Sequence, residues 1–246
     1  MSRVQRKKTR KAKIENGEQR VVTDKFMEQR RASFQPVKPL NDLQATYISL
    51  CREMPVVLAT GFPGTSKTYI PTCVAAELWF NNEIDKIYLV RPAVSSSKSL
   101  GYFSGSLIEK SKHWLGPILD TLIEKLGKNV VELAISSGQI EYIPLETIKG
   151  RSLKDCFIIV DESEDLKVDE FVKCITRLGE NATMVFAGDI LQSDLHSKNG
   201  LTVAVEMAKE DPTLPWGFVE FDRPSDIVRS DATRKAVLSL RRKGLI

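Results

Sequence analysis

Residues 60–68 read Thr-Gly-Phe-Pro-Gly-Thr-Ser-Lys-Thr, a glycine-rich segment that ends in a lysine and a threonine. Residues 56–59 before it form a short apolar run of the kind found in buried strands, and apolar residues recur at helical spacing from 67 to 82. A strand, a glycine-rich turn and a helix in this order are the context of a phosphate-binding loop. The backbone N–H groups of such a turn and the N-terminus of the following helix both favour bound phosphate.

The last residues of this loop carry its most specific chemistry. Lys67 is expected to reach the β- and γ-phosphates of a nucleotide, and the Thr68 hydroxyl is expected to bind Mg²⁺. Ser66 stands where the strict pattern has glycine, so Gly64 is expected to allow the close backbone approach. The alternative is an ordinary strand–turn–helix corner. The predicted nucleotide-binding residues of the loop are Gly61, Phe62, Pro63, Gly64, Thr65, Ser66, Lys67 and Thr68.

Composition limits the class of protein. The chain has 246 residues, 42% of them apolar, which suits a globular protein with a sizeable core. It has no run of 18 apolar residues, so no transmembrane helix is expected, and its basic N-terminus lacks the apolar segment of a secretory signal. The four scattered cysteines predict buried, reduced thiols in a cytoplasmic protein. Two histidines and no Cys-x-x-Cys predict no zinc site.

Positive charge is concentrated at the N-terminus. Residues 1–33 contain 11 Lys or Arg against 4 Asp or Glu, whereas the rest of the chain contains 25 against 28. We therefore expect residues 1–37 to form a basic, flexible arm and residues 38–246 to form one folded domain. Such an arm suits the phosphates of a nucleic acid. A solubilising tail without a partner is the alternative.

A second signal comes from residues 156–162, where five apolar residues run directly into two acids. The run is typical of a central strand buried on both faces. Asp161 is suited to hold Mg²⁺ through water, and Glu162 is suited to orient and deprotonate an attacking water molecule. The alternative is a strand whose end is merely capped by acidic residues.

Three more polar residues are candidates by position. Gln44 lies on a helix expected over residues 40–53, where a glutamine in P-loop motor ATPases reads the adenine edge; a surface glutamine is the alternative. Arg91 follows the strand expected at 86–90 and could face phosphate or nucleic acid, although a surface ion pair is the favoured interpretation. Gln192 belongs to a Gly-Asp-x-x-Gln turn that can aim it at a γ-phosphate, but Gly-Asp turns are common.

The remaining pattern predicts an α/β fold. Further strands are expected at 140–145, 183–187 and 217–221, and further helices at 107–126, 130–137, 200–209 and 231–242, the first disturbed near Gly116 and Pro117. Apolar strands that alternate with helices favour a mainly parallel sheet with helices on both faces. We therefore predict a three-layer α/β/α P-loop NTPase domain.

Several segments together resemble the PhoH-like ATPases. Those segments are residues 61–68, 90–94, 149–151, 159–162, 176–179, 188–195, 219–221 and 226–229. The resemblance covers about residues 38–240 and implies a RecA-like core in a ring-forming, hexameric ATPase linked to RNA metabolism. It implies that Lys67, Thr68, Asp161, Glu162 and Gln192 serve as phosphate, metal, base and sensor residues. Two departures are Ser66 in place of glycine, and Ser-Glu-Asp at residues 163–165 in place of Ala-Gln-Asn.

The function expected from these observations is Mg²⁺-dependent ATP hydrolysis that drives rearrangement of a single-stranded nucleic acid, RNA rather than DNA. A single RecA-like core has no second domain to supply an arginine to the γ-phosphate, so a neighbouring subunit is expected to supply one. Arg229 is the first candidate and Arg177 the reserve. Two alternatives remain open: an ATPase that acts on a protein partner, and a nucleotide- or nucleic-acid-binding scaffold with little turnover.

Overall fold

The computed structural model describes residues 34–92, 107–195 and 198–244, and its centre is a parallel β-sheet. Every strand pair in this sheet is parallel, in the order β3-β2-β4-β5-β1-β6. The prediction of a mainly parallel sheet is therefore confirmed. The strands are β1 (Val56–Gly61), β2 (Lys86–Val90), β3 (Ile140–Tyr142), β4 (Cys156–Val160), β5 (Thr183–Ala187) and β6 (Trp216–Phe221).

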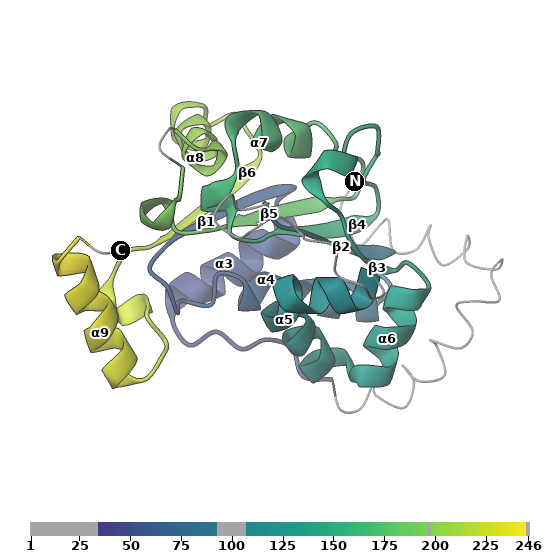
Figure 1. Ribbon diagram of the computed structural model, residues 1–246, viewed down its shortest axis with the longest axis horizontal. Helices are drawn as coiled ribbons and strands as arrows, with labels where there is room; N and C mark the ends of the chain where they lie inside the picture. The colour runs from purple at the N-terminus through teal and green to yellow at the C-terminus, as the bar shows by residue number, and fades with distance from the viewer. Residues whose placement is uncertain (1–33, 93–106, 196–197, 245–246) are drawn as a thin grey trace.

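Helices cover both faces of the sheet (Figure 1). The lower layer in that view contains α3 (Asp42–Glu53), α4 (Tyr69–Phe80), α5 (Leu107–Leu126) and α6 (Lys128–Ser136). The upper layer contains α7 (Val168–Ile175) and α8 (Gly200–Glu210). Each layer packs against one face of the sheet and forms a separate apolar core with it. The three-layer α/β/α architecture expected from the sequence is therefore present.

Strand β4 shows why the sequences of the central strands are continuous apolar runs. Phe157 and Ile159 pack in the core between the sheet and helices α3–α6. Ile158 and Val160 pack in the core between the sheet and helices α7 and α8. All four are fully buried, because the sheet is covered on both faces. Because such a strand is buried along its whole length, polar side chains are accommodated only after its end. Asp161 is the first residue after β4.

The helix predicted over residues 107–126 is present as α5, and the disturbance predicted near Gly116 and Pro117 does not interrupt it. The helix runs without interruption through Gly116 and Pro117 to Leu126. Proline removes one backbone hydrogen bond from a helix interior, but Ile118 and Leu122 are buried in the core beside it and hold the helix in place. Packing here outweighs the local preference.

Several element boundaries also differ from the predictions by one to three residues. The strand expected at 140–145 ends at Tyr142, because Pro144 cannot donate to a strand ladder and Leu145–Thr147 form the short 3₁₀ helix η1. Helix α4 begins at Tyr69 rather than at residue 67, since the loop before it includes Thr68. Three other 3₁₀ turns follow strands, namely η2 (Ser163–Asp165), η3 (Ile190–Gln192) and η4 (Pro224–Asp226).

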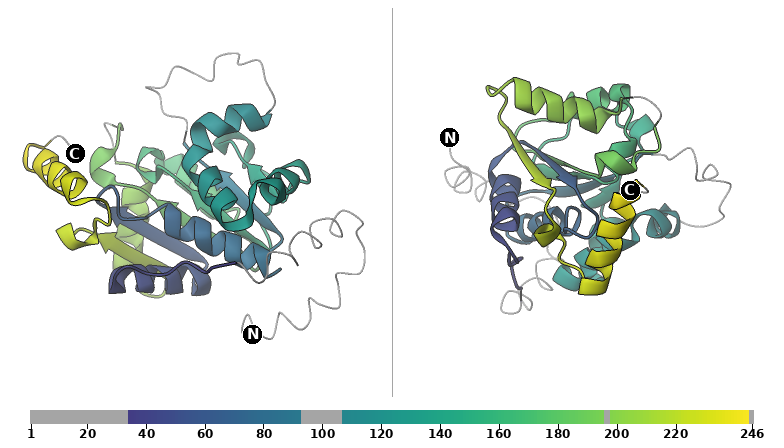
Figure 2. Two further views of the ribbon diagram at one scale, coloured as in Figure 1. Left: turned by 90° about the horizontal axis from the view of Figure 1, so that it is seen from below. Right: turned by 90° about the vertical axis from the view of Figure 1, so that its left-hand side faces the viewer.

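The C-terminal helix α9 (Asp231–Arg242) stands apart from both layers, at the end of the molecule next to β6 (Figures 1 and 2). At the other end of the described chain, the Phe34 ring stacks on Phe80 with centroids 4.6 Å apart, so contact with the core starts at residue 34. The predicted basic arm otherwise lies outside the described residues. No helix in the described ranges combines the length and apolar character needed to cross a membrane.

Candidate functional site: a nucleotide pocket at the carboxyl edge of the sheet

The loop between β1 and α4 adopts an unusual backbone conformation. Gly61, Gly64 and Ser66 have φ values of +114°, +77° and +73°. A Cβ on Gly61 would lie 2.2 Å from the Phe221 carbonyl oxygen, so only glycine fits there. Ser66 thus keeps the left-handed conformation that the expected glycine would adopt.

Neighbouring segments hold this loop in place. The Phe62 N–H donates to the Phe221 carbonyl oxygen at 2.9 Å, and the Val228 N–H donates to the Gly64 carbonyl oxygen at 3.1 Å. From the other side, the Tyr47 hydroxyl of α3 donates to the Lys67 carbonyl oxygen at 2.8 Å. The loop is therefore fixed by the end of β6, by the chain that follows it and by α3, all distant in sequence.

Gln44 supports the loop from within the protein. Its side chain is 2% exposed. The Leu40 N–H donates to its Oε1 at 2.9 Å, and its Nε2 donates to the Thr65 carbonyl oxygen at 3.4 Å. The structure thus places Gln44 behind the loop as a link between residue 40 and Thr65. Recognition of adenine by Gln44 stays a prediction.

Lys67 lies at the centre of the site. Its Nζ donates to the carbonyl oxygens of Gly61 at 2.6 Å and Phe62 at 2.7 Å, both within its own loop. Burial lowers the pKa of Lys67, and the charges of four surrounding acids oppose that decrease. These acids are Asp189, Glu164, Glu162 and Asp161. A cation enclosed in this way by a glycine-rich loop is suited to bind phosphate.

Thr68 and Asp161 meet across 93 positions of sequence. The Thr68 hydroxyl donates to Asp161 Oδ1 at 2.7 Å. Burial raises the pKa of Asp161, and this hydrogen bond acts in the opposite direction. The two oxygen ligands fit Mg²⁺, which is usually bound through one or two carboxylates together with substrate phosphates and water. Among the described residues, no group of three His, Cys, Asp or Glu side chains has a geometry that could hold a metal ion, so the phosphates and water would supply the remaining ligands.

Glu162 forms an ion pair that connects it to strand β2. Arg91 Nη2 lies 3.0 Å from Glu162 Oε1. Glu162 itself has a left-handed backbone, with φ +51° and ψ +44°, and turns the chain from β4 into η2. Burial raises the pKa of neighbouring Asp161, and the Arg91 charge opposes this increase. The favoured interpretation of Arg91 as an ion-paired residue is confirmed, and its partner is the predicted base.

Glu164 is a buried acid that the sequence did not single out as a site residue. It is 5% exposed and lines the cavity, and its Oε2 makes no hydrogen bond to another described group. Burial raises the pKa of Glu164 to about 9, and the nearby Glu162 adds to the increase. A Cβ on Gly188 would lie 2.2 Å from Glu164 Oε2, so a glycine there makes room for this carboxyl group. The signal in the sequence was the departure from Ala-Gln-Asn at residues 163–165.

Gln192 lies on η3 at the mouth of the site. Its Nε2 donates to Asp189 Oδ2 at 2.8 Å, while Asp189 Oδ1 accepts a hydrogen bond from the Leu191 N–H at 3.2 Å. Asp189 is buried and is the second residue after β5. The Gly-Asp turn and the sensor interpretation are compatible, because the turn is what directs Gln192 toward the cavity.

One cavity of about 660 Å³ brings the predicted residues together. Segments 63–69, 161–164, 187–192 and 228–229 supply most of its lining. Arg229 is among these residues, and its Cγ lies 2.7 Å from the position of a Cβ built on Gly64. Of the predicted nucleotide-binding residues, Gln44, Gly61 and Phe62 do not line the cavity. Arg229 thus reaches the nucleotide loop of its own chain.

Comparison with known proteins agrees with this geometry. A model of the PhoH-like protein family matches residues 36–240. The chain is 31% identical over 199 residues to Protein PhoH of Escherichia coli (strain K12), covering 79% of this chain and 55% of that protein. It is 35% identical over 196 residues to the PhoH-like protein of Bacillus subtilis (strain 168), covering 79% and 60%. The chain therefore spans about 55–60% of the length of these relatives. With its phosphate loop and acidic strand end in one cavity, the chain belongs to the PhoH-like protein family of P-loop ATPases.

Proposed function

We propose that this chain binds ATP together with Mg²⁺ and hydrolyses it. The observation that carries the proposal is the convergence of the phosphate loop, Asp161, Glu162 and Gln192 on one cavity at the carboxyl edge of a parallel sheet. Parallel sheets place ligands at this edge. The cavity volume of about 660 Å³ is within the range for ligands of this size.

Each residue has a role that follows from its position. Lys67 exchanges its two loop carbonyl contacts for phosphate oxygens when nucleotide binds. Thr68 and Asp161 would hold Mg²⁺, which supplies charge neutralisation on the phosphates when bound. Glu162 orients the attacking water molecule and accepts its proton. Gln192 contacts the γ-phosphate.

We further propose that hydrolysis is coupled to binding or rearrangement of single-stranded nucleic acid, RNA rather than DNA. The concentration of positive charge in residues 1–33 supports a phosphate-rich partner, and family membership supports this type of ATPase. A hexameric ring is the proposed assembly. The four buried free thiols support a cytoplasmic location.

The proposal is tested by ATP turnover with and without single-stranded RNA and DNA, using Lys67→Ala as the inactive control. Glu162→Gln should lower turnover by roughly 10²-fold or more, because it removes the base, while ATP binding stays nearly unchanged. A wild-type protein that binds ATP without releasing phosphate would indicate a scaffold. Turnover that neither RNA nor DNA stimulates would indicate a protein partner.

A further inference from the structure

Arg91 and Glu162 lie at the ends of adjacent strands. Val90 of β2 pairs with Val160 of β4, and the Asp161 N–H donates to the Val90 carbonyl oxygen at 3.0 Å. Arg91, the next residue after β2, is therefore beside Asp161, and Glu162 is one residue further along the chain. The left-handed turn at Glu162 follows at once, and its Oε1 lies 3.0 Å from Arg91 Nη2.

The backbone restricts both partners. Arg91 precedes Pro92, and a residue before proline is restricted to extended conformations. Glu162 has a left-handed backbone that a residue with a side chain adopts at an energetic cost. A left-handed residue at a strand end turns the chain sharply, so the carboxylate does not continue along the strand. Both ends of the ion pair are thus set by fixed backbone.

Glu162 and Arg91 differ in whether they line the cavity and in how exposed their side chains are. Glu162 lines the cavity, and its side chain is 42% exposed. Arg91 is outside the lining, and its side chain is 23% exposed. The guanidinium therefore holds the carboxylate from behind through Oε1 and leaves Oε2 for other contacts. Asp161 stands close to Glu162, and the two carboxylates repel each other, so an opposing cation is needed to fix the position of Glu162.

We propose that Arg91 is a positioning residue for hydrolysis, which fixes the carboxylate of Glu162 toward the attacking water molecule without touching the nucleotide. The inference rests on the hydrolytic role proposed above for Glu162. Removal of Arg91 should therefore lower kcat and leave KM and ATP affinity nearly unchanged. Half-exposed ion pairs contribute little to stability, so the variant should remain folded.

The test is a double-mutant cycle on single-turnover ATP hydrolysis. Arg91→Ala should lower the rate by about tenfold or more, because small displacements of catalytic groups have effects of this size. Arg91→Lys should lose less, since it keeps the charge but not the forked geometry. In a Glu162→Gln background, Arg91→Ala should cause no further loss, because its effect passes through Glu162.

Arg52→Ala is the matched control. It breaks the Arg52–Glu77 ion pair, which has an Nη2–Oε2 distance of 2.8 Å and joins α3 to α4 away from Glu162, and it should leave the rate unchanged. If the wild type hydrolyses ATP and Arg91→Ala hydrolyses it at the same rate, this inference is wrong, while the proposed function is retained. Equal losses from Arg91→Ala in both backgrounds, with weaker ATP binding, would also overturn it by showing a structural role. No wild-type turnover would overturn the proposed function and this inference together.

Discussion

At the scale of single residues, Ser66 shows how the loop accommodates a departure from its pattern. Its φ of +73° lies in the left-handed region, where the serine Cβ crowds the following carbonyl group. The neighbouring contacts of Phe62, Gly64 and Lys67 fix the loop on both sides and hold Ser66 in this conformation. The strain is therefore balanced by the surrounding structure.

Ser66→Gly should accordingly increase the free energy of unfolding by about 0.5–1 kcal/mol, the left-handed cost less the extra entropy of glycine in the unfolded chain. Urea denaturation measures the change. Ser66→Ala is the control, because it removes the hydroxyl and keeps the strained backbone. If both variants change stability equally, the hydroxyl and not the backbone is responsible.

Glu164 provides a prediction about pH. Its pKa of about 9 in the folded protein is above the ordinary value of 4.5 in the unfolded chain. Between these values the folded protein holds a proton that the unfolded chain has released, so stability falls as pH rises through this window. Glu164→Gln cannot ionise and restores the residue that the family pattern favours.

We expect the stability advantage of Glu164→Gln over the wild type to be small near pH 5 and to grow up to about pH 9. Urea denaturation at pH 5, 7 and 9 measures it. Glu210→Gln, a change at an exposed residue near the end of α8, serves as the control and should show no such growth. An advantage of Glu164→Gln that stays constant with pH would mean that Glu164 ionises in the folded protein as it does in the unfolded chain.

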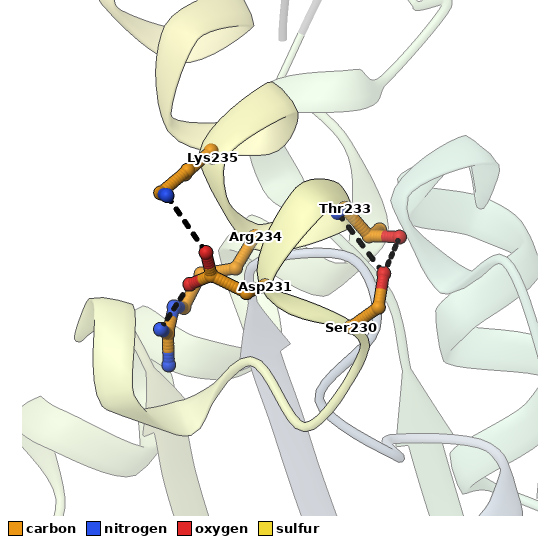
Figure 3. A network of polar contacts seen from close by, with 5 residues as sticks. All are labelled: Ser230, Asp231, Thr233, Arg234 and Lys235. Atoms are coloured by element: carbon orange, nitrogen blue, oxygen red, sulfur yellow. Dashed lines mark hydrogen bonds and ion pairs between the residues drawn. The ribbon is translucent and has the colours of Figure 1, made fainter.

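At the scale of elements, the N-terminal turn of helix α9 is stabilised by contacts among its own residues. Ser230 caps it by accepting a hydrogen bond from the Thr233 N–H at 3.2 Å, and Asp231 pairs with Arg234 and Lys235 (Figure 3). An acid in the first turn also suits the helix dipole. All these contacts are internal to the helix. The start of α9 is therefore stabilised by local contacts.

The attachment of α9 to the phosphate loop is small and specific. Val237 packs with Phe62 and Ile227 in a cluster separate from the two main cores. The Arg241 guanidinium carbon lies 4.3 Å from the Phe62 ring centroid. Because Phe62 belongs to the phosphate loop, α9 is a support for that loop.

Val237→Asp should detach α9, expose Phe62 and weaken ATP binding by about tenfold, equivalent to about 1.4 kcal/mol. The sheet should stay folded, since neither main core contains Val237. Calorimetric titration with ATP gives the affinity, and far-ultraviolet circular dichroism gives the fold. Leu240→Asp, on an exposed position of the same helix, is the control. Equal weakening by both variants would contradict a specific role for the Val237 contact.

At the scale of the whole molecule, the position of Arg229 bears on how subunits would cooperate. The sequence led to the expectation that this arginine serves a neighbouring subunit. In the structure it lines the cavity of its own chain beside Gly64. Lys67 and Arg229 thus line the same cavity within one chain, and we propose that they act in one site.

Mixing Arg229→Ala subunits with Lys67→Ala subunits should therefore restore no turnover, because neither chain has a complete site. Phosphate release by the mixture, compared with each parent and with wild type diluted by either variant, measures this. Mass photometry with ATP verifies that mixed assemblies form. Recovered activity in mixed rings would instead show that Arg229 acts across a subunit boundary.

The local elements of this protein were predictable from its sequence. The glycine-rich segment at 60–68 indicated the strand–loop–helix unit, and the apolar run before Asp161 indicated a strand buried on both faces. These features were predictable because backbone preference and apolar periodicity depend on near neighbours. The departures at Ser66 and at residues 163–165 were visible too, but only the φ of Ser66 and the burial of Glu164 gave them physical meaning.

Which of these segments contact one another became visible only in the folded protein. The contact between Thr68 and Asp161, the pairing of Arg91 with Glu162, and the placement of Arg229 over Gly64 all join residues distant in sequence. They follow from the strand order β3-β2-β4-β5-β1-β6 and the register of β2 with β4. Local patterns carry no information on which strands become neighbours, because that choice depends on packing both faces of the sheet at once.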